Sequence, residues 1–194
     1  MVFRERTYAV LLLSGSEKLD AQTRALLPAA EYYPVQSART VGQARRMLLE
    51  SSFDIVLIYA PLSDDFGTQL AIDVCTGTNA GALLLVKAEL LDSVSTRVTA
   101  YGVLTLSMPT STPLVTHSLR MLCAQRERIR RMESKQQSVE NTITELRLVN
   151  RAKWLLIENL RMTEPEAQRY LEKQSMDQRI TKRQAAETVI RTYG

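Results

Sequence analysis

Residue types that build catalytic and metal sites are scarce in this chain of 194 residues. It contains one histidine, His117, and two cysteines, Cys75 and Cys123. Two thiols do not make a disulfide framework, and their spacing to the histidine matches no zinc motif. The glycine-rich motifs that cradle nucleotide phosphates are also missing from the sequence. We therefore expect two buried free thiols, a reducing cytoplasmic setting, no metal, no cofactor and no enzymatic activity.

Long apolar runs are missing as well. No stretch reaches the roughly 18 apolar residues that a membrane-spanning helix needs. The apolar run at 9–13 is too short for a secretory signal and lacks a cleavage site. The sequence thus predicts neither a membrane span nor secretion. A net charge of +4 is mildly basic, which is compatible with nucleic acid without identifying it.

Strand-like and helix-like segments alternate through the first half of the chain. The alternation predicts an α/β fold, in which a five-stranded parallel sheet carries helices on both faces. Right-handed crossovers favour the flavodoxin-like strand order 2-1-3-4-5. Apolar runs predict strands at 8–13, 33–38, 55–59, 81–86 and 103–106. Helical spacing predicts helices at 16–30, 40–51, 66–76 and 91–100.

Short motifs mark this part of the chain: Phe53-Asp54-Ile55-Val56-Leu57-Ile58-Tyr59 with Pro61 and Gly67 after it, then Tyr101-Gly102 and Met108-Pro109. By these motifs, residues 8–123 or so resemble the receiver domain of response regulators, which has a CheY-like fold. The resemblance implies a site in which acidic residues at strand ends hold Mg²⁺ and one Asp accepts a phosphoryl group. A Thr or Ser and a Lys contact that group in a working receiver.

Matched position by position, this chain lacks all of these groups. Ser14 and Gly15 stand at the acidic pair, and Tyr59 stands at the phosphoacceptor. Lys87 replaces the Thr or Ser, and Met108 replaces the Lys. Mg²⁺ needs hard oxygen ligands, normally carboxylates, and a phenol does not replace a carboxylate nucleophile. The resemblance therefore implies a pseudo-receiver with a degenerate phosphorylation site, and it disfavours a regulator driven by phosphotransfer.

One long helix is expected from 112 to 160, because this stretch has no glycine and its only proline, Pro113, lies in the first turn. Heptad spacing within it predicts a coiled-coil seam between two copies of the chain. The alternative is a helix that packs on its own domains. The arginine-rich run 125–131 is interpreted as a solvated face or an auxiliary phosphate contact. The expected dimer seam is Ile129, Met132, Gln136, Val139, Ile143 and Leu146.

The C-terminal part has three helical runs. The first carries Leu148, Ala152 and Leu156 at helical spacing. Thr163 with Glu166, and Thr181 with Gln184, each have the spacing of a capping box. The second run carries Ala167, Tyr170, Leu171 and Met176, and the third carries Ala185, Ala186, Val189 and Ile190. Each run is too short to be stable alone, so the three are expected to pack together in a small all-α domain.

These runs resemble the ANTAR family of RNA-binding modules found in bacterial transcription antiterminators. The residues that carry the resemblance are Ala152-Lys153, Thr163-x-x-Glu166-Ala167, Leu171-x-Lys-x-x-Met176 and Ala186-x-x-Val-Ile190. The chain departs from the family pattern at Trp154, where a small residue is usual, and at Glu172, where Arg is common. The resemblance implies binding to a pair of short hairpins in a leader transcript.

Positively charged residues with neighbouring aromatic residues are the candidate RNA contacts. Lys and Arg would contact phosphates, while Trp154 and Tyr170 would either stack on bases or pack in the core. Gln174 would bond a base edge or face solvent. The candidate RNA-binding set is Arg147, Arg151, Lys153, Trp154, Arg161, Tyr170, Gln174, Arg179, Lys182 and Arg183.

The sequence therefore predicts three parts: a pseudo-receiver at 1–123, a coiled-coil connector at 124–147 and an ANTAR domain at 148–194. The predicted function is transcription antitermination by a homodimer that binds leader RNA hairpins, with a possible further signalling partner. The alternative is a homodimeric protein-interaction module that binds no RNA. The two hypotheses differ in salt dependence, because phosphate contacts weaken steeply as salt rises.

Overall fold

The computed structural model describes residues 7–194. The chain forms two compact units. One unit ends at Arg130 and the other begins at Arg131. The long helix α5 (Thr112–Leu160) contributes residues to both. No helix among the described residues is long and apolar enough to cross a membrane. Each unit is described by itself below.

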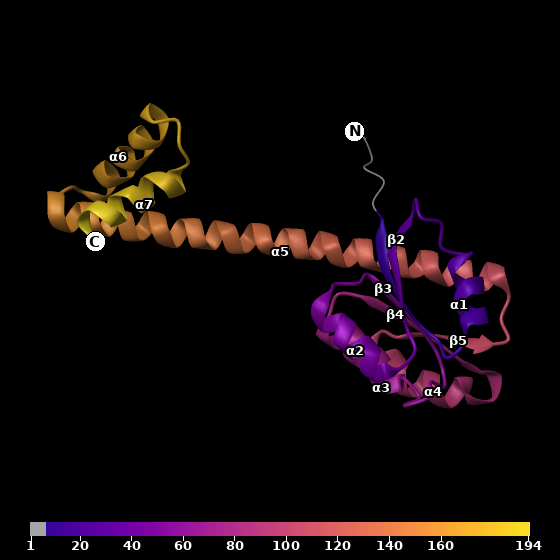
Figure 1. Ribbon diagram of the computed structural model, residues 1–194. Coiled ribbons are helices and arrows are strands. Elements are labelled where there is room, and N and C mark those ends of the chain that lie inside the picture. Colours follow the sequence, from indigo (N-terminus) through magenta and orange to yellow (C-terminus); the bar gives the residue numbers. More distant parts are fainter. Residues whose placement is uncertain (1–6) are drawn as a thin grey trace. The chain divides into compact units, whose positions relative to one another are not determined.

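The N-terminal unit is built on a five-stranded parallel sheet (Figure 1). The strand order is β2-β1-β3-β4-β5, which confirms the flavodoxin-like prediction. Val10 pairs with Ile55, and Ile55 pairs with Gly81, so the central strands share one register. All five residues of β3 are buried, as expected for a strand covered on both faces. The strands are β1 (Tyr8–Leu13), β2 (Tyr32–Ala38), β3 (Ile55–Tyr59), β4 (Gly81–Lys87) and β5 (Leu104–Met108).

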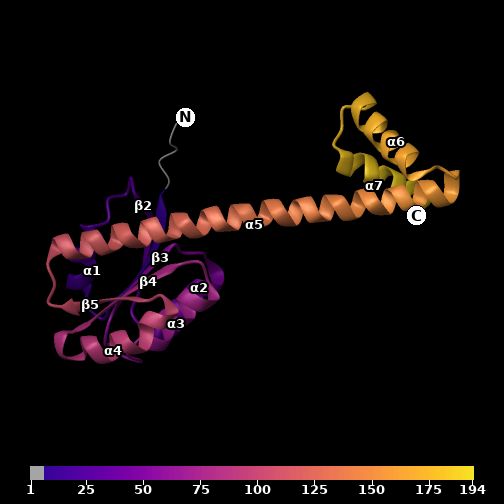
Figure 2. The same cartoon turned by 180° about the vertical axis from the view of Figure 1, so that it is seen from behind.

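Two apolar cores lie on opposite faces of this sheet. One face packs against α2 (Val41–Glu50), α3 (Thr68–Gly77) and α4 (Leu91–Val98). The other face packs against α1 (Glu17–Arg24) and the first part of α5, and Figure 2 shows the same two layers from behind. Short 3-10 turns, η1 (Ala88–Leu90) and η2 (Thr99–Tyr101), flank α4.

The helix expected at 16–30 is wrong in its length, because α1 ends at Arg24. Beyond Arg24 the backbone hydrogen bonds span three residues instead of four: the Leu26 N–H donates to the Thr23 carbonyl and the Leu27 N–H donates to the Arg24 carbonyl. Pro28 follows at once and has no N–H with which to continue the helix. Leu27 is nevertheless buried, so the apolar pattern was correct while the helix boundary was not.

Helix α5 approaches the sheet closely in the N-terminal unit. Val115, Leu119 and Leu122 are buried against it. A Cβ atom added to Gly81 of β4 would lie 2.7 Å from Leu122 Cδ2, so any larger residue there would force the Leu122 side chain to shift.

A cluster of charged side chains then connects α5 to Asp54, the residue directly before β3. Asp54 Oδ1 accepts from Arg126 Nε at 2.9 Å and from Arg130 at 2.7 Å. The other Asp54 oxygen accepts the backbone N–H of Ala9 at 3.0 Å. Arg130 also pairs with Glu127 at 2.6 Å. The interpretation of 125–131 as a solvated face is therefore wrong for Arg126 and Arg130, whose side chains are only 14% and 21% exposed.

The C-terminal unit packs the end of α5 against α6 (Glu164–Asp177) and α7 (Lys182–Tyr193). Both predicted capping boxes, at Thr163 and at Thr181, are formed. Met176, which the sequence pattern grouped with the apolar residues of α6, is 76% exposed, and Ser175 is buried instead, four residues after Leu171. The core is Ala152, Leu156, Ala167, Leu171, Ala185, Ala186 and Val189.

Candidate nucleic-acid interface and receiver-like strand ends

Tyr59 ends β3 with its side chain largely buried, at 9% exposure. Its hydroxyl lies 2.6 Å from Thr23 Oγ1. Thr23 has one hydroxyl hydrogen and donates it to the Leu19 carbonyl at 2.8 Å, so Tyr59 is the donor to Thr23. Burial raises the pKa of Tyr59, and the Asp20 charge adds to this. The phenol is therefore held neutral and already hydrogen-bonded.

A fixed arginine lies beside the end of β1. Arg39 donates to the Ser14 carbonyl at 3.0 Å and pairs with Asp20 at 2.7 Å. The Ser14 side chain is bonded to the backbone of Ser16. Mg²⁺ does not fit this donor set, because a guanidinium occupies the neighbourhood of the one buried carboxylate. Across residues 7–194, no group of three or more His, Cys, Asp or Glu could hold a metal ion.

The sequence interpretation missed Asp20 and Arg39. The available signal for Asp20 was the inward face of α1, where Asp20 and Thr23 are three residues apart and both are buried. A charged residue at such a position requires a partner.

The other residues of the predicted degenerate phosphorylation site do not lie together in one site. Lys87 and Met108 are register partners across β4 and β5, and Lys87 is exposed. Tyr59 and Met108 line a cavity of about 510 Å³ together with Thr23. Ser14, Gly15 and Lys87 do not line it. The structure thus brings only two of the five positions into a shared cavity.

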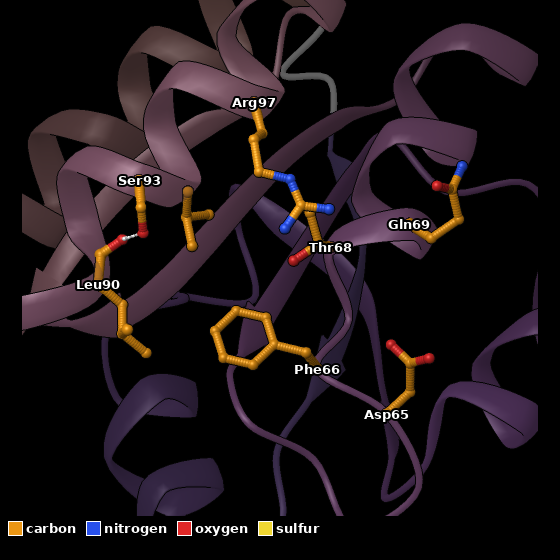
Figure 3. Close-up of a pocket in the computed structure, with 8 residues that line it drawn as sticks. Asp65, Phe66, Thr68, Gln69, Leu90, Ser93 and Arg97 are labelled. Atoms are coloured by element: carbon orange, nitrogen blue, oxygen red, sulfur yellow. Dashed lines mark hydrogen bonds between the residues drawn. The ribbon is translucent and has the colours of Figure 1, made fainter.

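A second hollow, of about 370 Å³, lies between α3, α4 and the loop before α3 (Figure 3). Phe66 and Thr68 line one side, while Ser93 and Arg97 come from α4. The Ser93 hydroxyl donates to the Leu90 carbonyl at 3.0 Å. This arrangement provides no activated nucleophile.

The positively charged candidates in the C-terminal unit fall into two groups: those in ion pairs with glutamates and those without an ion-pair partner. Lys153 pairs with Glu164 at 3.1 Å. Lys182 pairs with Glu172 at 2.9 Å, and Arg183 pairs with Glu187 at 2.9 Å. Hydrogen bonds from Gln168 and Lys182 lower the pKa of Glu172. Four candidates are exposed and have no ion-pair partner in the described part of the chain: Arg147, Arg151, Arg161 and Arg179.

Trp154 is 71% exposed, so the core-packing alternative is wrong for this residue. Tyr170 is half-buried and packs against the apolar core of the unit, as the core alternative expected. Gln174 is half-buried, and its side-chain oxygen accepts from Gln178 at 2.8 Å. Arg169 and Lys173, which were not selected, are exposed one turn apart on α6.

Part of the expected dimer seam is exposed apolar surface. Met132 is 60% exposed, Val139 57%, Ile143 44% and Leu146 57%. Gln136 is exposed as well, while Ile129 is half-buried in the N-terminal unit. The four apolar side chains are therefore not covered within the C-terminal unit itself, which leaves both the dimer seam and the packed-helix alternative as predictions.

Comparison with known proteins finds a family match in the C-terminal unit and structural relatives of a receiver fold. Residues 137–190 match the ANTAR domain model. No curated protein sequence is detectably similar to the chain.

Solved structures of the CheY-like fold resemble the rest of the chain. A signal receiver domain of an HD domain-containing protein from Pseudomonas fluorescens Pf-5 is 20% identical, with a TM-score of 0.59, over 68% of this chain and 96% of that one. A CheY-like receiver domain protein from Methanospirillum hungatei JF-1 is 16% identical, with a TM-score of 0.55, over 63% and 99%. An adenylate cyclase from Rhodopirellula baltica is 15% identical, with a TM-score of 0.62, over 68% and 98%. At such identities the likeness shows the fold alone.

Proposed function

Because the chain carries an ANTAR domain together with a CheY-like receiver fold, we propose that it is an RNA-binding transcription antitermination regulator. It binds hairpins in leader transcripts and so favours the RNA shape that lets polymerase continue. Both families are regulatory, and neither supplies an enzymatic activity to this chain.

The observation that carries the proposal is one exposed face of α5 in the C-terminal unit. Arg147, Arg151 and Trp154 follow one another at four- and three-residue intervals, which places them on the same side of the helix. All three are exposed, and neither arginine has an ion-pair partner within residues 7–194. Unpaired arginines suit phosphates, and an exposed indole suits stacking on an unpaired loop base.

The receiver-like unit takes no phosphoryl group in this proposal. Tyr59 is neutral and bonded to Thr23, and Arg39 lies where a metal would need carboxylates. The unit acts as a scaffold that positions the start of α5 and offers a surface to a signalling partner.

The regulator works as a homodimer through the exposed seam at 132–146. Two linked ANTAR domains bind two hairpins of one transcript, and the linkage raises the effective concentration of the second contact. The same seam also favours the second candidate function, a homodimeric protein-interaction module without RNA.

Recovery of RNA from the native host tests the proposal. The full chain is purified from cells after cross-linking, and the bound RNA is sequenced. We expect enrichment of leader regions that contain paired hairpins, reduced in a variant with Arg151→Ala and Trp154→Ala. Recovery of unselected RNA in the same amount from both proteins would overturn the proposal in favour of the interaction module.

A further inference from the structure

The two turns of the C-terminal unit repeat one local structure. Each turn begins with an arginine, continues with an apolar residue that packs against the core, and ends with a threonine in a capping box: Arg161–Thr163 and Arg179–Thr181. Four residues after each threonine a buried alanine follows, Ala167 and Ala185. Figure 1 shows the two turns at opposite ends of α6.

Both arginines have φ of 55°, in the left-handed region. Residues with a Cβ rarely adopt this conformation, and glycine adopts it freely. Around Arg179 the backbone closes the helix with Ile180 N bonded to Ser175 O at 3.0 Å and Arg179 N bonded to Met176 O at 3.2 Å. This hydrogen-bond pattern most often has glycine at the position of Arg179. The backbone therefore disfavours arginine here.

The two side chains make no compensating contact within the protein. Both are exposed, and neither has a hydrogen bond or ion pair among residues 7–194. The other cations beside these turns, Lys153, Lys182 and Arg183, are each paired with a glutamate. A strained conformation that is retained without an internal contact is typical of a residue kept for binding.

On the basis of the proposed RNA binding, we propose that Arg161 and Arg179 are a matched pair of phosphate contacts, presented by the repeated turn at the two ends of α6. A guanidinium donates a fork of N–H groups that fits a phosphate. The 14 residues of α6 at roughly 1.5 Å each span about 21 Å. Contacts this far apart fit a folded hairpin, and a single nucleotide reaches only one of them.

Replacement by glycine separates binding from folding. Arg161→Gly and Arg179→Gly relieve the backbone, so the thermal midpoint is expected to stay the same or rise. The probe is the leader hairpin recovered with the wild-type protein. Each variant should bind it about fivefold more weakly near 0.15 M salt, with a salt slope lower by about 0.7–0.9. The double variant should lose about 25-fold, because distant contacts act independently.

Two further variants serve as controls. Arg46→Ala removes the same charge from an exposed arginine of α2 that has no ion-pair partner among residues 7–194, and it should leave affinity unchanged. Arg161→Lys keeps the charge and should keep the salt slope. Glycine variants that bind like the wild type, or that unfold at lower temperature, would overturn the proposal while the RNA function stands. A wild-type protein that binds no hairpin would instead overturn the proposed function itself.

Discussion

At the residue scale, buried phenols in the N-terminal unit resist ionisation. Burial and the nearby Glu127 raise the pKa of Tyr8 to about 12 from 10.0. Burial likewise raises the pKa of Tyr32 and of Tyr59. The unfolded chain releases these protons near pH 10 while the folded chain retains them. The stability that Tyr8 contributes in this way is therefore complete below pH 10 and is lost as the pH rises through about 12.

Tyr8→Phe tests this dependence. The variant has one fewer phenol to titrate, so its stability should fall less steeply between pH 10 and 11 than that of the wild type. The measurement is the urea midpoint of the N-terminal unit at pH 8, 9, 10 and 11. Parallel curves for the two proteins would show that the Tyr8 proton is not linked to folding.

Tyr59 should accept no phosphoryl group. Its hydroxyl is bonded to Thr23, and the one nearby carboxylate, Asp20, is paired with Arg39 at 2.7 Å. We expect the intact mass to be unchanged after incubation with acetyl phosphate and Mg²⁺. A stoichiometric gain of about 80 Da, one phosphoryl group, mapped to the ends of β1, β3 or β4 would contradict this.

Single residues show where sequence reasoning stops. Strands β4 and β5 extend to Lys87 and Met108, past the predicted ends at 86 and 106. The position of Tyr59 at the end of β3 followed from an apolar run, because a buried strand is a local pattern. The exposure of Trp154 did not, because it depends on which face of α5 meets α6 and α7, and that choice is tertiary. The left-handed backbone conformation of Arg179 could not be predicted from the sequence either, because glycine is the residue that usually adopts it at the end of a helix.

At the element scale, the Asp54 cluster fixes how the first part of α5 lies on the sheet. Asp54→Asn removes the charge that faces Arg126 and Arg130 and leaves two partly buried cations without it. The expected loss is about 3 kcal/mol in the free energy of unfolding, at the lower end for a broken buried pair because the side chains keep some exposure. Urea unfolding of the N-terminal unit measures it.

The control for this variant is Asp92→Asn on the exposed surface of α4. It should change stability by less than about 0.5 kcal/mol. An equal loss of unfolding free energy in the two variants would show that the Asp54 cluster does not hold α5 on the sheet.

The seam of α5 should hold two copies together. Ile143→Asp with Leu146→Asp places charges in an interface that would otherwise exclude water, at a cost of several kcal/mol. Sedimentation should show a dimer for the wild type and a monomer for the double variant. Helix content should be retained in both, as circular dichroism can check. A monomeric wild type at micromolar concentration would contradict the seam.

The element boundaries were predictable to different degrees. Helix α5 from Thr112 to Leu160 agreed fully, since its ends are marked by Pro113 and by the capped turn at Thr163. The compact N-terminal unit runs to Arg130, past the predicted 123. The Asp54 contacts that extend it join residues more than 70 positions apart, which no local pattern reveals. The predicted domain limits otherwise remain predictions.

At the scale of the whole molecule, the chain joins a receiver-like fold to an ANTAR domain through one continuous helix. In the receiver-like unit Ser14 and Tyr59 are hydrogen-bonded internally and Asp20 is paired with Arg39. The ANTAR unit instead leaves Arg147, Arg151 and Trp154 exposed, and neither arginine has an ion-pair partner among residues 7–194. The chemistry available for binding is therefore concentrated in the second unit. RNA, the partner proposed above, would use both the charge and the indole.

The most direct test is a salt titration of binding between the full chain and a leader hairpin recovered from the native host. We expect the logarithm of affinity to fall linearly with the logarithm of salt, with a slope of about 0.7–0.9 for each phosphate contact. Arg151→Ala should lower this slope by about one unit, while Lys153→Ala and Arg183→Ala, which break internal ion pairs, should lower it less. A hairpin affinity that is independent of salt, or no hairpin binding at all, would contradict the RNA-binding account.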